Sequence, residues 1–134
     1  MNKLIIYTDG GARGNPGPAG IGAVIYNEKK EIIAEISEYI GESTNNQAEY
    51  KALLAAIKKA KEFKVDEINF FLDSELVVEQ MSGNYKVKNK SLQPLFVQIY
   101  NESLSYKKVT YKHVRREKNK EADRLANMAM DKAC

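Results

Sequence analysis

The protein has 134 residues, of which 43% are apolar and 29% are charged, and its formal net charge is +3. These values are typical of a globular domain with its own hydrophobic core, so we expect a single domain over residues 1–134. The one cysteine, Cys134, excludes a disulfide framework and a cysteine-based metal site, which favours a cytoplasmic location. The first apolar run is too short for a signal sequence or a membrane span, so we expect no membrane partner.

The first half of the chain is predicted to begin with three strands. Residues 3–9 are mostly apolar, which indicates a central strand covered on both faces. Two more strands are expected at 20–27 and 31–40, joined as a hairpin by a short polar connection. Residues 45–63 form the clearest predicted helix, and residues 44–46 are candidates to cap its start. The positions of this helix that we expect to face inward are Ala48, Ala52, Leu53, Ala56, Ile57, Ala60 and Phe63.

The second half alternates between the two kinds of element. We expect a strand, two helices, a strand and a final helix, at 67–73, 74–81, 91–105, 107–114 and 119–133. The expected inward positions of the last two long helices are Leu92, Leu95, Phe96, Ile99 and Leu104, then Ala122, Leu125, Ala126 and Ala129. Three consecutive strands followed by alternating elements predict an α/β fold, with helices on the faces of a mixed sheet.

A loop rich in glycine and proline follows the first predicted strand. Six of the eight glycines lie between Gly10 and Gly22, and Pro16 and Pro18 are two of the three prolines. The loop follows Asp9, an acid at the end of an otherwise apolar strand. Because Asp-Gly is a strong turn signal, the simplest interpretation is that Asp9 begins a tight turn.

Three further acids interrupt apolar patterns and favour a different interpretation. Glu49 lies on the inward stripe of its helix, where a carboxylate is costly unless it is paired or binds a metal. Asp73 ends an apolar strand, and Asp123 lies at the edge of the inward stripe of the last helix. Sites in open α/β sheets form beyond the carboxyl ends of the strands, so two parallel strands would bring Asp9 and Asp73 together.

Each acid alone also has a structural explanation. Asp73 is able to cap the next helix, Glu49 to reach back to a capping position, and Asp123 to lie in solvent. Four such coincidences at one cleft are a weaker explanation than a shared site. Clustered carboxylates repel one another unless cations neutralise them, and oxygen ligands suit Mg²⁺ or Mn²⁺. The pattern therefore indicates metal-assisted phosphoryl transfer.

Four segments of the chain carry a further signal: YTDGGARGNPGPAGIGAV (7–24), STNNQAEYKALLAAI (43–57), LDSELVVEQM (72–81) and NKEADRLAN (119–127). In this order, over nearly the whole chain, they resemble the type 1 ribonuclease H family. The resemblance implies a ribonuclease H-like fold: a five-stranded mixed sheet, three antiparallel strands and then two parallel ones, flanked by helices. It also implies hydrolysis of the RNA strand of RNA–DNA hybrids by two-metal-ion cleavage, which leaves 5′-phosphate and 3′-hydroxyl ends.

The resemblance also implies roles for individual residues. The implied catalytic carboxylates, which would hold two Mg²⁺ or Mn²⁺ ions with substrate, are Asp9, Glu49, Asp73 and Asp123. Glu49 would lie near the 2′-hydroxyl of the cut strand, the group that distinguishes RNA from DNA. Thr44 would bind a phosphate of the DNA strand. The residues that would contact the backbone and minor groove of the hybrid are Asn15, Asn45 and Asn46.

The chain departs from well-known members of this family near its end. Those members have a glycine-flanked histidine in a loop before the last aspartate, whereas the segment here is shorter and its one histidine, His113, ends a predicted strand. We interpret His113 as structural or exposed at the sheet edge. We hypothesise that Arg115 or Arg116 reaches the scissile phosphate instead.

Basic residues are unevenly distributed. The substrate-binding insertion of many relatives is reduced here to a compact segment with Lys86, Lys88 and Lys90, and Glu75 replaces a glutamine that contacts substrate in well-known members. Residues 107–120 contain seven basic residues and one acid. Such a cluster is either a solvated face or a surface for phosphates. We expect weaker hybrid binding, partly restored by this segment.

The sequence therefore predicts a monomeric endoribonuclease that acts on RNA–DNA hybrids, with double-stranded RNA as a further candidate partner. Two alternatives remain open. One is a non-catalytic module that binds hybrids or double-stranded RNA, and the other is a different metal-dependent nuclease of the same fold.

Overall fold

The computed structural model describes residues 2–133, so Cys134 lies outside the described residues. Its five strands form one sheet in the order β3-β2-β1-β4-β5. The strands are β1 (Lys3–Ala12), β2 (Gly17–Tyr26), β3 (Ile32–Ser43), β4 (Glu67–Leu72) and β5 (Lys108–His113). The first three pair antiparallel, while β4 runs parallel to β1 and β5 parallel to β4. The predicted mixed sheet is confirmed.

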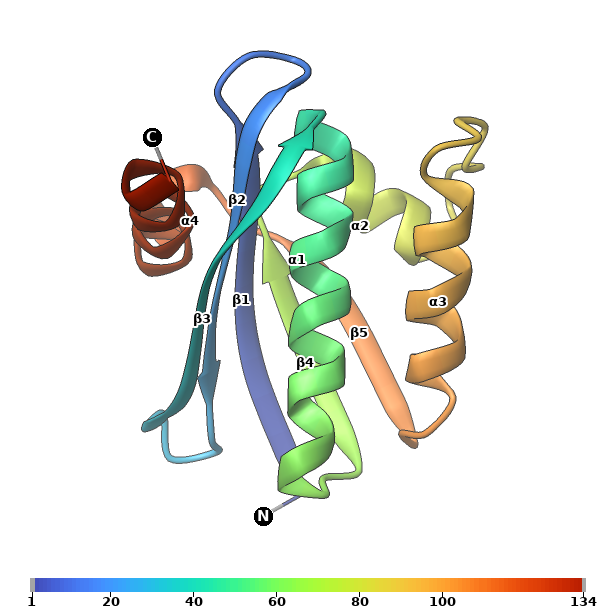
Figure 1. The fold of residues 1–134 in the computed structure, drawn as a ribbon. Helices are drawn as coiled ribbons and strands as arrows, with labels where there is room; N and C mark the ends of the chain where they lie inside the picture. The colour runs from blue at the N-terminus through green and yellow to red at the C-terminus, as the bar shows by residue number, and fades with distance from the viewer. Residues whose placement is uncertain (1, 134) are drawn as a thin grey trace.

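The helices cover the two faces of the sheet unequally (Figure 1). Three helices, α1 (Asn45–Ala60), α2 (Glu75–Met81) and α3 (Gln93–Ser103), lie on one face, and α4 (Lys120–Ala133) lies alone on the other. Two short 3-10 helices, η1 (Lys61–Phe63) and η2 (Arg116–Lys118), follow α1 and precede α4. No helix within residues 2–133 is both long enough and apolar enough to cross a bilayer.

The predicted stripe of α1 is confirmed, because all of its inward positions within the helix are buried. Phe63 lies in η1 and is half-buried. Thr44 is the N-cap: its hydroxyl accepts the Gln47 N–H at 3.1 Å, and Gln47 Oε1 accepts the Thr44 N–H at 3.0 Å. This reciprocal capping box fixes where α1 begins, four residues before Glu49.

Two glycines allow a helix to approach the sheet closely on each face. A side chain at Gly10 would overlap the Ala48 carbonyl of α1, and one at Gly22 would overlap the Ala122 carbonyl of α4. These two glycines lie on adjacent strands, because Gly22 pairs with Asp9 in the ladder between β1 and β2. The glycine-rich segment therefore seats α1 and α4 against the sheet on either side of Asp9.

Two expectations, one about β1 and one about α3, are wrong, and the alternative interpretation of Asp9 as the start of a turn is excluded. Asp9 begins no turn, because antiparallel pairing of β1 with β2 continues to Ala12. β1 is not covered on both faces either, since Ile5 and Tyr7 lie beyond the cover of α4 and are half-buried. Leu104 is 66% exposed, because it follows Ile99 by five residues and so points about 140° away from it around the helix.

Candidate active site

Three acidic side chains meet where the parallel part of the sheet ends. Thr8 and Leu72 form the last pair between β1 and β4, so Asp9 and Asp73 are the next residues on two neighbouring strands. Glu49 comes to the same place from the first turns of α1. Carboxylate oxygens of Asp9, Glu49 and Asp73 all lie within 4.8 Å of one another.

Glu49 is held in this group by the backbone of β1. Only 6% of Glu49 is exposed, and its Oε1 accepts the Gly10 N–H at 2.5 Å. The close seating of α1 over Gly10 makes this contact possible. The second oxygen, Oε2, is buried without a hydrogen-bond partner among the described residues. A buried carboxylate oxygen without a hydrogen-bond donor is suited to act as a ligand of a cation.

Asp123 lines the same acidic cleft, which has a volume of about 460 Å³. It comes from the first turn of α4, and Asn127 Nδ2 donates to its Oδ1 at 3.3 Å and to its carbonyl at 3.0 Å. Asp123 is not one of the three acids that lie within 4.8 Å of one another. The structure therefore places all four predicted carboxylates in one cleft, and Asp123 lies close enough to Asp9 and Asp73 to raise the pKa of both.

Burial makes these acids difficult to ionise together. It is the main cause that raises the pKa of Asp9, and the charges of Glu49 and Asp73 raise it further. Burial also raises the pKa of Glu49 and of Asp73. A divalent cation favours the ionised forms, and hard oxygen donors without nitrogen or sulfur suit Mg²⁺ or Mn²⁺. The donor set fits the metal expected from the sequence.

The glycine- and proline-rich loop is tied to both helices that supply acids. Asn15 Oδ1 accepts the Asn45 N–H at 3.0 Å, and Asn45 Oδ1 accepts the Ala12 N–H at 2.8 Å. At the other side, the Arg13 guanidinium donates to the Asp131 carboxylate of α4 at 2.5 Å. These contacts hold the loop between α1 and α4, at one rim of the cleft.

The predicted substrate residues are placed differently from one another. Asn45 and Asn46 line the cleft directly. Asn15 acts on it through the loop contact with Asn45. Thr44 caps α1 next to this rim, and its hydroxyl accepts a backbone N–H there.

The two candidate arginines have different positions, although they are adjacent in sequence. Arg116 lines the cleft, and its charge lowers the pKa of Glu49 and Asp73, partly opposing the effect of burial. The Arg115 side chain is 83% exposed, and it lies 3.9 Å from the Glu117 carboxylate. The structure thus brings Arg116 into the site and leaves Arg115 outside. His113 is exposed at the end of β5, in agreement with its interpretation.

Asn119 is a site residue that the sequence reasoning missed. It is only 1% exposed, and its Nδ2 donates to the Thr8 carbonyl at 2.9 Å. Its carbonyl accepts the Asp123 N–H at 3.1 Å, and its polar side chain beside Asp73 lowers the pKa of that acid. Asn119 therefore joins β1, β4 and α4. Its spacing of four residues before Asp123 was the available signal.

A family model and several known proteins match nearly the whole chain. A family model described as "Reverse transcriptase-like" matches residues 7–129. The "Bifunctional protein Rv2228c" of Mycobacterium tuberculosis is 46% identical over 132 residues, which cover 98% of this chain and 36% of that protein. The "Ribonuclease H" of Ruthia magnifica is 36% identical over 151 residues and is covered to 98%, as is this chain.

A solved structure shows the same likeness in three dimensions. LC11-RNase H1, isolated from compost, was crystallised in complex with an RNA/DNA hybrid. It is 50% identical to this chain with a TM-score of 0.93, and the match covers 97% of this chain and 98% of that one. The chain spans only 36% of the length of the mycobacterial relative, so that protein has further segments with no counterpart here.

Proposed function

This chain belongs to the type 1 ribonuclease H family, and we propose that it is an endoribonuclease that hydrolyses the RNA strand of RNA–DNA hybrids. The observation that carries this proposal is the group of Asp9, Glu49 and Asp73 at the ends of two neighbouring parallel strands. Asp123 lines the same cleft as this group. Its 50% identical neighbour LC11-RNase H1, which was solved with a hybrid, supports the substrate class.

The four carboxylates would hold the metal ions. Two bound Mg²⁺ or Mn²⁺ ions would supply an activated water and stabilise the leaving oxygen, and the products would carry 5′-phosphate and 3′-hydroxyl ends. The orphaned Oε2 of Glu49 and the raised pKa of the buried acids support metal binding by this group. Asn119 would hold Asp73 and the start of α4 in place, which keeps the four carboxylates around one cleft.

The rim of the cleft would bind and orient the substrate. Within the described residues, the cations that line the acidic cleft are Arg13 and Arg116. Arg13 is paired with Asp131, so we assign Arg116 to the scissile phosphate. Asn45 and Asn46 face the cleft and would contact the backbone and minor groove of the hybrid.

Two residues behind this rim complete the proposed substrate site. We assign Asn15 to the support of the rim, through its hydrogen bond with Asn45. We assign Thr44 to a phosphate of the DNA strand, in addition to its role as N-cap. Glu49 would lie beside the 2′-hydroxyl of the RNA strand.

We propose further that residues 1–134 act as one domain, as a monomer, in the cytoplasm. The contacts of α4 with β1 through Asn119, and with the loop through Arg13, tie the two ends of the chain together. This supports a single unit with one cleft.

One experiment tests the proposed function directly. Labelled RNA–DNA hybrid, duplex DNA and duplex RNA of one sequence are incubated with Mg²⁺, with Mn²⁺ or with EDTA, and the ends of the products are mapped. We expect cleavage of the RNA strand of the hybrid, with either metal and not with EDTA, leaving 5′-phosphates. Cleavage of duplex DNA would contradict the proposal. Cleavage of duplex RNA at the same rate would show that it is too narrow.

A further inference from the structure

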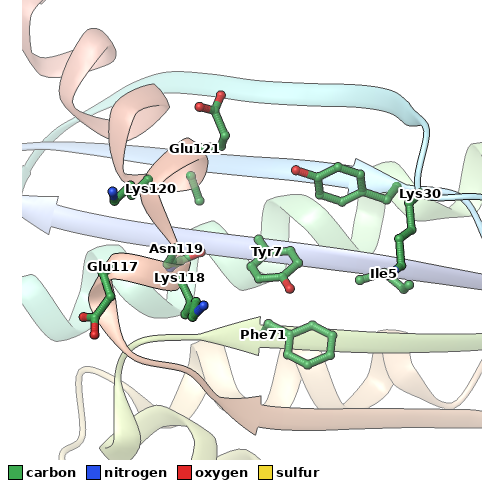
Figure 2. A pocket seen from close by; sticks show the side chains of 11 residues that line it. Ile5, Tyr7, Lys30, Phe71, Glu117, Lys118, Asn119, Lys120 and Glu121 are labelled. Carbon is green, nitrogen blue, oxygen red and sulfur yellow. The ribbon is translucent and has the colours of Figure 1, made fainter.

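The face of the sheet that carries α4 is only partly covered by that helix. Beyond α4, three aromatic side chains lie on three neighbouring strands: Tyr26 lies on β2, Tyr7 on β1 and Phe71 on β4. Tyr7 and Phe71 are labelled in Figure 2. Tyr7 pairs with Phe71 in the ladder between β1 and β4, and Tyr26 pairs with Ile5. Residues paired in this way lie on the same face, so the three rings form a row across the sheet.

The rings are packed against one another but not buried. Tyr7 stacks on Phe71 with ring centroids 5.0 Å apart and 19° between the planes. Tyr26 meets Tyr7 edge to face, at 5.9 Å and 81°. All three side chains are half-buried in the described residues. Their exposed surfaces form the floor of a cavity of about 500 Å³, which is the size of a small-ligand site.

Basic side chains surround this floor. Lys30, Lys118 and Lys120 line the cavity, and Lys112 pairs with Phe71 in the ladder between β4 and β5, so it lies on the same face. Two acids, Glu117 and Glu121, also line it. The basic segment 107–120 is therefore divided between two sites. Arg116 lines the acidic cleft, and three lysines of the segment lie beside the aromatic floor: Lys112, Lys118 and Lys120.

We propose that this aromatic floor binds unpaired nucleotides of a single-stranded nucleic acid. Bases stack on exposed aromatic rings whatever their sequence, and lysines around such a platform hold the phosphates. Aromatic side chains on adjacent strands of an open sheet face are a common way to bind single strands. Glu117 and Glu121 exclude phosphates from their own positions, so the strand would pass along Lys112 and Lys118.

This site is separate from the catalytic cleft. Residues 116–122 stand between the two, because Arg116 lines the cleft whereas residues 117–122 line the aromatic cavity. Binding of a single strand here requires neither a metal nor hydrolysis. Such binding is therefore independent of the proposed activity and is testable without it.

The test measures binding of a fluorescent oligodeoxythymidine of about 12 nucleotides, a length within the site sizes of such platforms. Anisotropy is recorded in EDTA, with an excess of unlabelled blunt hybrid to occupy the catalytic cleft. We expect Tyr7→Leu/Phe71→Leu to raise the Kd roughly ten-fold, because bases stack far less well on an aliphatic side chain than on an aromatic ring. Leu keeps an apolar side chain at each position, which limits the damage to the sheet.

Matched controls separate stacking and charge from general effects. Tyr100→Leu removes a half-exposed tyrosine on α3, far from this face, and should leave the Kd unchanged. Lys118→Gln/Lys120→Gln should reduce the slope of log Kd against log salt by about 0.7 for each phosphate that these lysines neutralise. Lys58→Gln/Lys132→Gln changes the net charge equally at other places and should leave that slope nearly unchanged.

A measurement on the wild-type protein keeps the test decisive if the aromatic variant fails to fold. Amide NMR shifts on titration with the oligonucleotide should be largest around Tyr7, Tyr26 and Phe71 and at 118–121. Shifts confined to the catalytic cleft or to residues 85–90 would overturn the proposal. So would an unchanged Kd in the folded aromatic variant, or an equal drop in affinity in Tyr100→Leu.

Discussion

Two hollows lie on either side of residues 116–122: the acidic hollow, which is the catalytic cleft, and the aromatic hollow, which is the cavity over Tyr7, Tyr26 and Phe71. Strand β1 contributes to both, but the side chains that line them differ in kind. Ile5, Tyr7 and Asp9 alternate along β1, so all three point to the same face of the sheet. Where α4 approaches over Gly22, this face is shielded and carries an acid whose pKa burial raises. Beyond the start of α4, toward Tyr7 and Ile5, the same face is open and aromatic. The position of the start of α4 thus decides which part of β1 places a buried carboxylate in the acidic cleft and which part presents exposed aromatic rings.

The largest effect is expected from a substitution that removes activity at the acidic hollow and leaves binding at the aromatic hollow unchanged. Asp73→Asn keeps the shape of the side chain and removes one charge from the group that Asp73 forms with Asp9 and Glu49. We expect the kcat for hybrid cleavage to fall on the order of a thousand-fold, because a metal ligand contributes several kcal/mol to the transition state. Single-turnover cleavage of labelled hybrid measures this. Binding of the single-stranded probe should stay within about two-fold of wild type. Hybrid cleavage that survives in Asp73→Asn would contradict the assignment.

The next largest effect is expected at Arg116, the first residue of the wall (residues 116–122) that separates the two hollows, and we compare it with its neighbour Arg115. Arg116→Ala should lower kcat/KM about 10- to 100-fold, because hydrogen bonds to charged groups contribute about 1.5–3 kcal/mol. Arg115→Ala is the matched control, since this side chain is exposed and lies outside the cleft. Steady-state cleavage at one salt concentration compares them. Equal losses in both variants would show that the effect is one of net charge alone.

The variant Asn119→Ala tests whether Asn119 holds the wall between the two hollows in place. Asn119→Ala leaves the Thr8 carbonyl without its donor, so we expect the free energy of unfolding to fall by about 1–3 kcal/mol. Urea denaturation measures this loss. Because Asn119 also contacts Asp73, cleavage should weaken at temperatures where the variant is still folded. Arg124→Ala on the outer side of α4 removes only exposed contacts and serves as the control. A variant with unchanged stability would show that the wall is held by other contacts.

The smallest effect is a pH dependence that belongs to the acidic hollow alone. The folded state raises the pKa of Asp9, Glu49 and Asp73, so their contribution to stability is fully present below their unfolded pKa values of about 4. It is lost as the pH rises toward the folded values. Metal-free protein should therefore have a lower Tm at about pH 8 than at about pH 5 relative to Asp9→Asn, in which one of these charges is absent.

Calorimetry in EDTA at both pH values measures this difference. Mg²⁺ should restore the Tm of the wild type at the higher pH, because a cation that binds only the folded state stabilises it. Asp9→Asn should respond less to Mg²⁺. A wild-type Tm that rises relative to Asp9→Asn between the two pH values would contradict the direction of these shifts.

Much of the acidic hollow could be predicted from the sequence, because each acid interrupts a local apolar pattern. Glu49 stands on a helical stripe and Asp73 ends a strand, and such conflicts between residue type and pattern can be read without a structure. The extent of β1 could not be predicted, because pairing with β2 continues past an Asp-Gly pair that alone favours a turn. Nor could the choice between Arg115 and Arg116, which depends on the turn at η2.

The aromatic hollow could not be predicted for a different reason. Tyr7, Tyr26 and Phe71 each lie in a predicted strand, and nothing in the local sequence distinguishes them from other strand residues. Whether they are covered depends on where α4 begins over the sheet and on how the strands are ordered, which no local pattern contains. Asn119 was missed because its partners, Thr8 and Asp73, are far away in sequence.

The seating of α1 over Gly10 and of α4 over Gly22 has a consequence for how this protein tolerates mutation. In a saturation library selected for activity, the acids would be depleted for chemical reasons, and most neighbours would accept several replacements. Gly10 and Gly22 should be depleted as severely as the acids, since any side chain would push Glu49 or Asp123 away from Asp9. Two residues without a functional group would then mark the site as clearly as those that perform the chemistry.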